Sequence, residues 1–409
     1  MEKILVHICC GVDSVYALRK LKEDYPNSQL IGYFYDPNIH PQEEFELRWI
    51  ETKRVCDQLG IECIKGDYEL DKWMEAVKGY ENEPERGERC TICHDLRLEK
   101  SAQIAKELGC NKITTVLMMS PKKDFDVLKE VGEKVANKYG LEFLAVDFRK
   151  NGGTQIMNKL SKEAQLYHQN YCGCIYGLFS QRKDLEFYPE LVSFGKGRLA
   201  GSREELLFVK QIRLFAESLG LNCFEEEFTF IGWRLLSSSV KLNKDYIPHR
   251  VLPYSTSING ILRASVLDVK EHSLVLNKNN AEVYLTTDLK EPILKEPRYI
   301  TKPVFLIKEE VKVGDKLELQ LKTEFNPSMK SQNLYVGNRN TFVDIAEFYS
   351  DTDSEGNQGY SLQDICYFIK DNKEKIEKGE LLVVVYGAHL IGEIGKRFST
   401  LHTQVFSEA

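Results

Sequence analysis

The first half of the chain alternates short apolar runs with longer amphipathic stretches of helical period. The apolar runs predict strands at 3–8, 30–35, 61–65, 112–117 and 141–146. The helical patterns lie at 15–22, 43–59, 70–78, 96–108 and 127–139. Strands that alternate with helices of this length pair in parallel. We therefore predict an α/β fold with a doubly wound parallel sheet, in which ligands bind at the carboxyl ends of the strands.

The second half begins after residues 184–197, which show no period and contain Pro189 and two glycines. A helix is predicted at 203–219. Short β-rich runs follow at 266–269, 273–276, 283–286, 304–307 and 316–321, and the pattern then returns to strand and helix at 341–348, 362–372 and 381–386. These patterns predict one domain over residues 1–187 and a second α/β domain over 194–409, with 228–325 as a β-rich insertion.

Composition narrows the class of protein. With 409 residues the chain is too long for one ordinary domain. A formal charge of −7 gives no bulk attraction to nucleic acid, so RNA contact would need a local basic patch. Candidate pairs, each also consistent with a plain solvated surface, are Lys122-Lys123, Arg149-Lys150 and Arg182-Lys183. The apolar runs are too short for a membrane helix and the N-terminus reads directly into a strand, so we expect a cytoplasmic protein.

Cysteine is the most informative residue type. Of 11 cysteines, six form three close pairs: Cys9 with Cys10, Cys90 with Cys93, and Cys172 with Cys174. Clustered pairs in an intracellular chain favour metal or redox chemistry over structural disulfides. The first two pairs supply four thiolates, which suit either a [4Fe–4S] cluster or a structural zinc ion.

The third pair has a different spacing, Cys172-Gly173-Cys174. The glycine allows the backbone to bring the two sulfurs together, which is typical of a strained and readily reduced disulfide. The alternative interpretation is a pair of structural cysteines. A cluster and a dithiol together would allow the protein to transfer two electrons to a substrate.

Five segments in order make residues 1–185 resemble the cobalamin-independent epoxyqueuosine reductase family of tRNA modification. They are His7–Cys10, Phe34–Pro41 with Glu44 and Arg48, Arg89–Cys93, Asp147–Lys150, and Leu166–Gln169 continuing into Tyr171–Tyr176. The family often has a third cysteine where this chain has Asp13. The resemblance also implies a core shared with adenine-nucleotide hydrolases, whose phosphate loop ends like Cys10–Ser14.

The resemblance implies a reaction and the residues that perform it. The reaction is the two-electron deoxygenation of epoxyqueuosine to queuosine in the anticodon loop of tRNA, with an external electron donor. The implied ligands of a [4Fe–4S] cluster are Cys9, Cys10, Cys90 and Cys93, and Asp13 would ligate the cluster or one additional iron. Cys172 and Cys174 would form a catalytic, redox-active disulfide, and either this pair or the cluster, fed by an outside reductant, would supply the electrons. The candidate proton donors are Asp13, His7 and Tyr171.

Two other functions remain compatible with the residues alone. An ATP-dependent tRNA thiolation enzyme or other nucleotide-hydrolase-like enzyme would bind phosphate at Cys10–Ser14, although a thiolate-rich turn repels phosphate. A zinc-stapled RNA- or protein-binding module would use the same cysteines without redox chemistry.

Residues from about 194 to 409 resemble a degenerate zinc aminopeptidase of the co-catalytic type. The resemblance lies in Gly197–Ser202, Asn333–Val336, Val343–Ala346 and Gly387–Gly392, and the β-rich middle matches a protease-associated insertion. The catalytic pattern is broken, and only Glu347, Asp351, Asp353 and His389 remain as candidate ligands. We expect a pseudo-peptidase that binds or scaffolds without cleaving peptides.

Overall fold

The computed structural model describes residues 2–182, 202–251, 260–287, 289, 302–349 and 360–387. The chain divides into two compact units, Met1–Ser193 (unit 1) and Phe194–Ala409 (unit 2). Within the described ranges, every helix is too short or too polar to cross a membrane.

Unit 1 is built on a five-stranded parallel sheet. Its strands are β1 (Lys3–Ile8), β2 (Gln29–Phe34), β3 (Glu62–Lys65), β4 (Lys112–Thr115) and β5 (Glu142–Phe143). Their order in the sheet is β3-β2-β1-β4-β5, and every pair is parallel. The predicted α/β fold with a parallel sheet is confirmed. The first strand is central, so the residues that follow it lie in the middle of the edge where the strands end.

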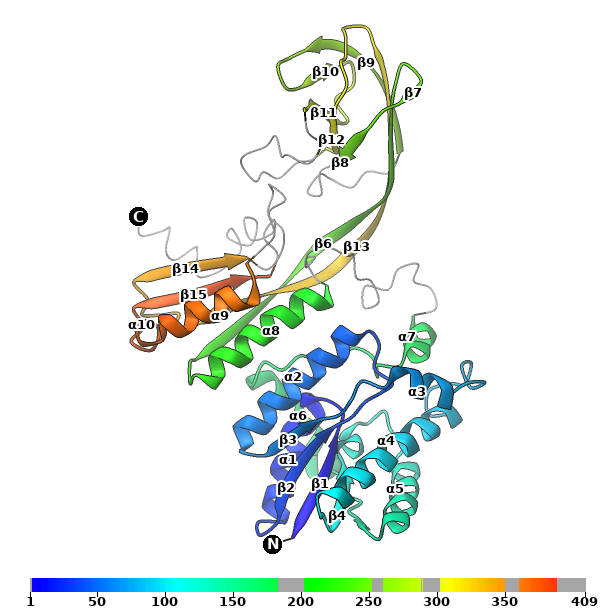
Figure 1. Ribbon diagram of the computed structural model, residues 1–409, viewed down its shortest axis with the longest axis vertical. Helices are drawn as coiled ribbons and strands as arrows, with labels where there is room; N and C mark the ends of the chain where they lie inside the picture. The colour runs from blue at the N-terminus through cyan, green and yellow to red at the C-terminus, as the bar shows by residue number, and fades with distance from the viewer. Residues whose placement is uncertain are drawn as a thin grey trace. The chain divides into compact units, whose positions relative to one another are not determined.

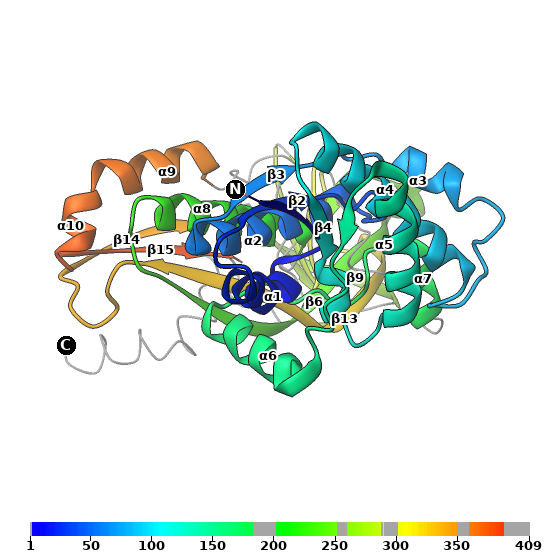
Figure 2. The same ribbon diagram turned by 90° about the horizontal axis from the view of Figure 1, so that it is seen from below.

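Helices cover both faces of this sheet. They are α1 (Gly11–Asp24), α2 (Gln42–Leu59), α3 (Leu70–Ala76), α4 (Glu88–Glu107), α5 (Phe125–Tyr139), α6 (Gly153–Glu163) and α7 (Ile175–Gln181). Figures 1 and 2 show α1, α2 and α6 on one face and α4 and α5 on the other. Side chains along β1 alternate between the two cores: Val6 packs in the core with α1 and α2, and Leu5 in the core with α4 and α5.

Two predicted strands of unit 1 are shorter than their apolar runs. β4 ends at Thr115, whose hydroxyl accepts a hydrogen bond from the amide of Leu117 at 3.1 Å and starts a 3-10 turn over Val116–Met119. β5 pairs only at Glu142–Phe143, although the apolar run extends to residue 146. A continuous apolar run shows burial, and it does not show where the ladder of backbone hydrogen bonds stops.

Unit 2 is organised around a long antiparallel ribbon of two strands. β6 (Cys223–Leu242) pairs with β13 (Lys316–Val336) along almost their whole length. The register shifts twice, and one shift lies between Asn326 and Met329, where Pro327 cannot donate a ladder hydrogen bond. The sequence predicts a strand that ends at residue 321, and this bound is wrong, because a bulge carries the strand past the proline to Val336.

Each end of the ribbon carries its own core. At one end, β15 (Leu381–Tyr386) joins β13, and β14 (Asp344–Tyr349) pairs in parallel with β15. The helices α8 (Arg203–Ser218), α9 (Leu362–Asp371) and α10 (Lys373–Glu377) pack at this end (Figure 1). At the other end lie β7 (Asp245–Tyr246), β8 (His249–Val251), β9 (Gly260–Val269), β10 (Leu274–Leu276), β11 (Glu282–Leu285) and β12 (Val304–Ile307).

A buried ion network fastens α8 to the ribbon. Glu225 of β6 accepts from Lys210 Nζ at 2.7 Å and from Arg213 Nη1 at 2.8 Å, and all three side chains are buried. Burial alone would raise the pKa of Glu225, but the two cations outweigh it and hold the pKa below its usual value.

We expect Glu225→Gln to destabilise unit 2 by about 3–5 kcal/mol, because it leaves two buried cations without their carboxylate. The wild-type pair stabilises the fold above the unfolded-state pKa of Glu225 and loses this contribution as the pH falls through the lowered folded-state pKa, so the difference between the proteins should shrink in acid. The measurement is a urea titration followed by hydrogen exchange in residues 203–218. Glu318→Gln, in the exposed network with Lys241 and Arg263, is the matched control and should change little. Equal stabilities of Glu225→Gln and wild type would contradict the expectation.

Candidate active site

The first cysteine pair lies where the central strand of unit 1 ends. Cys9 and Cys10 follow β1 directly, and Cys10 caps α1, because its Sγ accepts a hydrogen bond from the amide of Asp13 at 3.4 Å. The turn packs tightly against α2: a Cβ atom added to Gly11 would lie 2.8 Å from the carbonyl oxygen of Glu51. Only glycine fits at this position, so the turn is fixed by close contact between backbones.

Cys9, Cys10 and Asp13 form a compact group of acidic side chains. Cys9 Sγ lies 3.8 Å from Cys10 Sγ and 3.5 Å from Asp13 Oδ2. The hydrogen bond with Cys10 and burial raise the pKa of Cys9, and burial raises the pKa of Asp13. Their ligand atoms all lie within 4.8 Å of one another. Burial and mutual contact disfavour the charged forms of Cys9 and Asp13 when no cation is present, and a metal ion would reverse this effect. Two soft sulfur donors and one hard oxygen donor this close together therefore fit a bound metal ion.

The second pair lies in the first turns of α4. Cys93 is buried, and burial raises its pKa to about 12. The sulfur of Cys90 accepts a hydrogen bond from the amide of Arg86 at 3.3 Å. One helical turn beyond Cys93 lies Arg97, whose Nη1 is 4.0 Å from Cys93 Sγ, and this guanidinium also lies close enough to Cys9 to hydrogen-bond it. Both cysteine pairs therefore lie within reach of one buried cation.

The third pair forms a turn that precedes α7. The thiol of Cys174 hydrogen-bonds Cys172, which together with the nearby ammonium of Lys123 lowers the pKa of Cys172 to about 5, against the opposing effect of burial. The same interaction and burial raise the pKa of Cys174. In this structure both cysteines are free thiols. At neutral pH the turn therefore holds Cys172 as a thiolate and Cys174 as a thiol.

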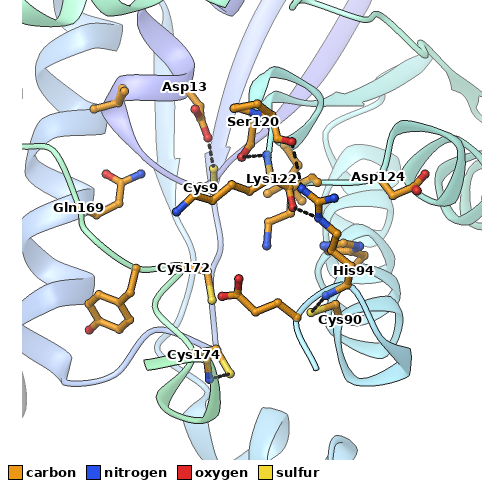
Figure 3. A pocket seen from close by; sticks show the side chains of 18 of the residues that line it. Cys9, Asp13, Cys90, His94, Ser120, Lys122, Asp124, Gln169, Cys172 and Cys174 are labelled. Carbon is orange, nitrogen blue, oxygen red and sulfur yellow. Dashed lines mark hydrogen bonds between the residues drawn. The ribbon is translucent and has the colours of Figure 1, made fainter. Parts of the chain in front are cut away.

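At least one cysteine of each pair lines a single cavity, together with Asp13. Cys9, Asp13, Cys90, Cys172 and Cys174 border a pocket of about 350 Å³. Figure 3 shows the four labelled cysteines around one opening, with Gln169 beside Cys9 and His94 beside Cys90. Two of the predicted site residues, Cys10 and Cys93, do not line the pocket. The Sγ atom of Cys10 accepts a hydrogen bond at 3.0 Å from Nε2 of Gln169, which does line it.

The pocket is richer in basic than in acidic groups. Six cations line it: Arg48, Arg86, Arg89, Arg97, Lys122 and Lys123. The acidic lining residues are Asp13, Glu85 and Asp124. This excess suits a reactant that carries phosphate or develops negative charge.

Two of the three candidate proton donors are committed elsewhere. His7 is fully buried outside the pocket, where Nε2 pairs with the carbonyl of Tyr35 at 3.0 Å and Nδ1 with the hydroxyl of Thr115 at 2.8 Å. Burial lowers the pKa of His7, so the ring is neutral. Tyr171 lines the pocket, but its hydroxyl donates to the carbonyl of His40. Asp13 remains the best-placed of the three.

Sequence reasoning missed several groups that line the pocket. Arg97 follows Cys93 by four residues and shares its helix face, a signal that the spacing does contain. Lys123 belongs to a basic pair that is a candidate RNA contact, although the sequence favours a solvated surface for it. Its ammonium group lies close to Cys172 and Cys90. His94 is buried, and its pKa falls to about 3 through burial and the charge of Lys123, so this ring is neutral in the pocket.

The remaining metal-ligand candidates of unit 2 do not assemble in the described residues. Glu347 lies on β14, where its Oε1 accepts a hydrogen bond from the hydroxyl of Tyr386 at 2.7 Å. The other three candidates, Asp351, Asp353 and His389, lie outside the described residues. The expectation of a pseudo-peptidase therefore stays a prediction.

Comparison with known proteins gives a clear match for unit 1. A family model described as "Epoxyqueuosine reductase QueH" matches residues 4–180. An epoxyqueuosine reductase QueH of Helicobacter pylori is 41% identical over 254 residues, which cover 60% of this chain and 68% of the relative. One of Histophilus somni is 39% identical over 183 residues, covering 44% of this chain and 74% of the relative.

The match to the Helicobacter protein extends beyond unit 1. Unit 1 contains 193 of the 409 residues, fewer than half, so a match over 60% of the chain includes residues of unit 2. A solved aminopeptidase from Aneurinibacillus sp. strain AM-1 covers 51% of this chain and is itself covered to 65%, at 14% identity and a TM-score of 0.36. A similarity this low assigns neither a fold nor a function.

We expect metal-free protein to react with iodoacetamide at Cys172 in preference to Cys174 at pH 6. Above its pKa of about 5, Cys172 is a thiolate, and the raised pKa keeps Cys174 protonated. Cys174→Ala removes the hydrogen-bond donor, so the pKa of Cys172 should rise toward its ordinary value. Once that pKa exceeds 6, the reaction at pH 6 should slow by about tenfold for each further unit of rise. Peptide mass spectrometry after anaerobic alkylation measures both sites. Equal labelling of the two sulfurs in the wild type would be inconsistent with this assignment.

Proposed function

The chain belongs to the epoxyqueuosine reductase QueH family and is an oxidoreductase of tRNA queuosine biosynthesis, and we propose that its reaction takes place in the cysteine-lined pocket of unit 1. The observation that carries this proposal is the convergence of Cys9, Cys90, Cys172, Cys174 and Asp13 on one cavity. These residues come from distant parts of the sequence, and each of the four cysteines belongs to a motif that the family resemblance uses, whereas Asp13 stands where the family often has a third cysteine.

The reaction requires two electrons and two protons. Epoxyqueuosine loses its epoxide oxygen, both carbon–oxygen bonds break, a carbon–carbon double bond forms, and the oxygen leaves as water. A dithiol that closes to a disulfide releases two electrons and two protons, which balances this change. We assign that role to Cys172 and Cys174, and an external electron donor then restores the dithiol.

The starting protonation of the pair favours this role. Cys172 is the thiolate and therefore the nucleophile, and Cys174 is the thiol. Disulfide formation from this state releases two electrons and the one proton of Cys174, so the second proton comes from another group. Asp13, whose pKa is raised by burial, lines the same pocket, and we assign it to transfer a proton toward the departing oxygen in a state in which its carboxyl group does not ligate iron.

Metal ligation is the second part of the proposal. Cys9, Cys10, Cys90 and Cys93 would hold a [4Fe–4S] cluster, and Asp13 would ligate it or one additional iron next to Cys9 and Cys10. Iron bound there would supply Lewis acidity toward the epoxide oxygen and make it a better leaving group.

The substrate proposed for this pocket is the anticodon loop of tRNA. Cations at the pocket, among them Arg86, Lys122 and Lys123, supply the local positive charge that the overall charge of −7 does not. Nucleotide binding at this turn is less well supported. In a phosphate loop the backbone amides are available to the phosphate, but here the amide of Asp13 donates its hydrogen bond to the sulfur of Cys10. For residues 194–409 we propose a non-catalytic binding domain, with its insertion at 228–325.

Protein purified without oxygen should be brown and contain about four irons per chain. Cys93→Ser should lose the iron, because an alcohol is a poor ligand for iron–sulfur clusters. The matched control is Cys56→Ser, since Cys56 is equally buried but lies on α2 and pairs with Cys63 away from the pocket. Iron and sulfide analysis measures both variants. One zinc ion and no iron in the wild type would instead support the zinc-stapled module.

Cys172→Ser should keep the iron and lose turnover, because serine cannot form the disulfide that releases two electrons. The assay converts epoxyqueuosine in tRNA to queuosine in the presence of a chemical reductant, with nucleoside mass spectrometry as the readout. Cys110, a buried cysteine between α4 and β4 that does not line the pocket, provides the control, and Cys110→Ser should retain activity. Loss of iron in Cys172→Ser would show that this residue is a ligand and would overturn the division of roles.

A further inference from the structure

The backbone of the Cys172-Gly173-Cys174 turn is held from one side by the segment that leads into α2 and by α2 itself. Arg48 Nη2 donates to the carbonyl of Tyr171 at 3.0 Å, and Arg48 Nη1 donates to the carbonyl of Cys172 at 3.2 Å. The next carbonyl, of Gly173, accepts from the amide of His40 at 2.9 Å. Three consecutive peptide units of the turn are thus fixed by hydrogen bonds, two of them to one guanidinium.

The side chain of Arg48 is itself held in place by hydrogen bonds. Its Nε donates to Glu44 Oε1 at 2.8 Å, and the hydroxyl of Tyr167 donates to Glu44 Oε2 at 2.8 Å. The relative exposures of Arg48, Glu44 and Tyr167 are 3%, 0% and 8%. A planar guanidinium with one edge on a carboxylate and the other on two carbonyls is held in a single orientation, which a lysine could not reproduce.

Close packing adds to these hydrogen bonds. Gly173 has a φ of +99°, and a Cβ atom there would lie 2.7 Å from Cγ1 of Ile39, which is fully buried. The two sulfurs flank this glycine, and Figure 3 shows Cys172 and Cys174 next to each other at the edge of the pocket. The turn therefore has little freedom to separate them.

We propose that Arg48 is a positioning residue for the dithiol, and that its hydrogen bonds to the carbonyls of Tyr171 and Cys172 set the equilibrium between the dithiol and the disulfide. The proposal rests on the redox role assigned above to Cys172 and Cys174. Arg48 acts through the backbone: it keeps one sulfur at a high effective concentration toward the other, so closing the disulfide loses little conformational freedom.

The test is a redox titration of the full-length, anaerobically purified protein in glutathione buffers. Glutathione disulfide takes two electrons from the two thiols, which become the Cys172–Cys174 disulfide, and the two protons complete two molecules of glutathione. Trapping free thiols by alkylation and mapping the peptide that contains both cysteines gives the equilibrium constant. We expect Arg48→Met and Arg48→Lys each to lower this constant by about tenfold, which corresponds to a rise of about 30 mV in the reduction potential.

The chain provides a matched control. Arg54 lies on the same helix and is 1% exposed; it pairs with Glu51 at 2.8 Å and donates to the carbonyl of Ala164 at 3.2 Å. Arg54→Met removes a buried arginine of the same kind, so it should lower stability while leaving the equilibrium constant unchanged. Should Arg48→Met fold poorly, Tyr167→Phe releases only the carboxylate of Glu44, and it should shift the constant in the same direction by less.

The outcomes separate this proposal from the function it rests on. A wild-type protein that forms no Cys172–Cys174 disulfide in any buffer would overturn the redox role of the pair, and the positioning role with it. A wild-type disulfide with unchanged constants in the Arg48 and Tyr167 variants would overturn the positioning role alone. An equal shift in Arg54→Met would also overturn it, because the effect would then follow from general loss of stability.

Discussion

A buried ion pair between Arg97 of α4 and Asp36, just after β2, holds the two sides of the pocket together. Their side-chain exposures are 5% and 0%, so neither charge has water to replace its partner. Removing one partner of such a pair typically costs about 3–5 kcal/mol, because the other charge stays buried. Since α4 also carries Cys90 and Cys93, this pair fixes their position relative to Cys9 and Cys10, which follow the neighbouring strand β1.

Much of this site follows from sequence because its residues lie in short motifs with definite spacing. The three cysteine pairs and Asp13 are visible as local patterns, and the parallel sheet predicts that Cys9 and Cys10 lie at the edge that binds ligands. The sequence does not show which residues of different motifs contact one another. That Lys123 lies close to Cys172, and that Arg48 binds the carbonyl of Cys172, depend on long-range packing that no local period encodes.

The fold shows the same division. In unit 1 the five predicted strands and the five predicted helices all have counterparts, although two strands are shorter than their apolar runs and α6 and α7 are not predicted. In unit 2 the pattern locates β-structure but misses that β13 runs from Lys316 to Val336 without a break. A proline normally ends a central strand. β13 nevertheless continues past Pro327, because its pairing with β6 resumes after a register shift, which the sequence alone does not reveal.

The central position of β1 has a consequence for the order in which a growing chain can fold. β1 is synthesised well before β4, its partner on one side, which begins at Lys112, and the turn that completes the pocket ends at Cys174. Contacts that span this much sequence close late, after the intervening segments have left the ribosome. The four pocket cysteines can therefore meet only in a chain that has been extended past residue 174, and until then Cys9 and Cys10 are exposed thiols on an incomplete sheet.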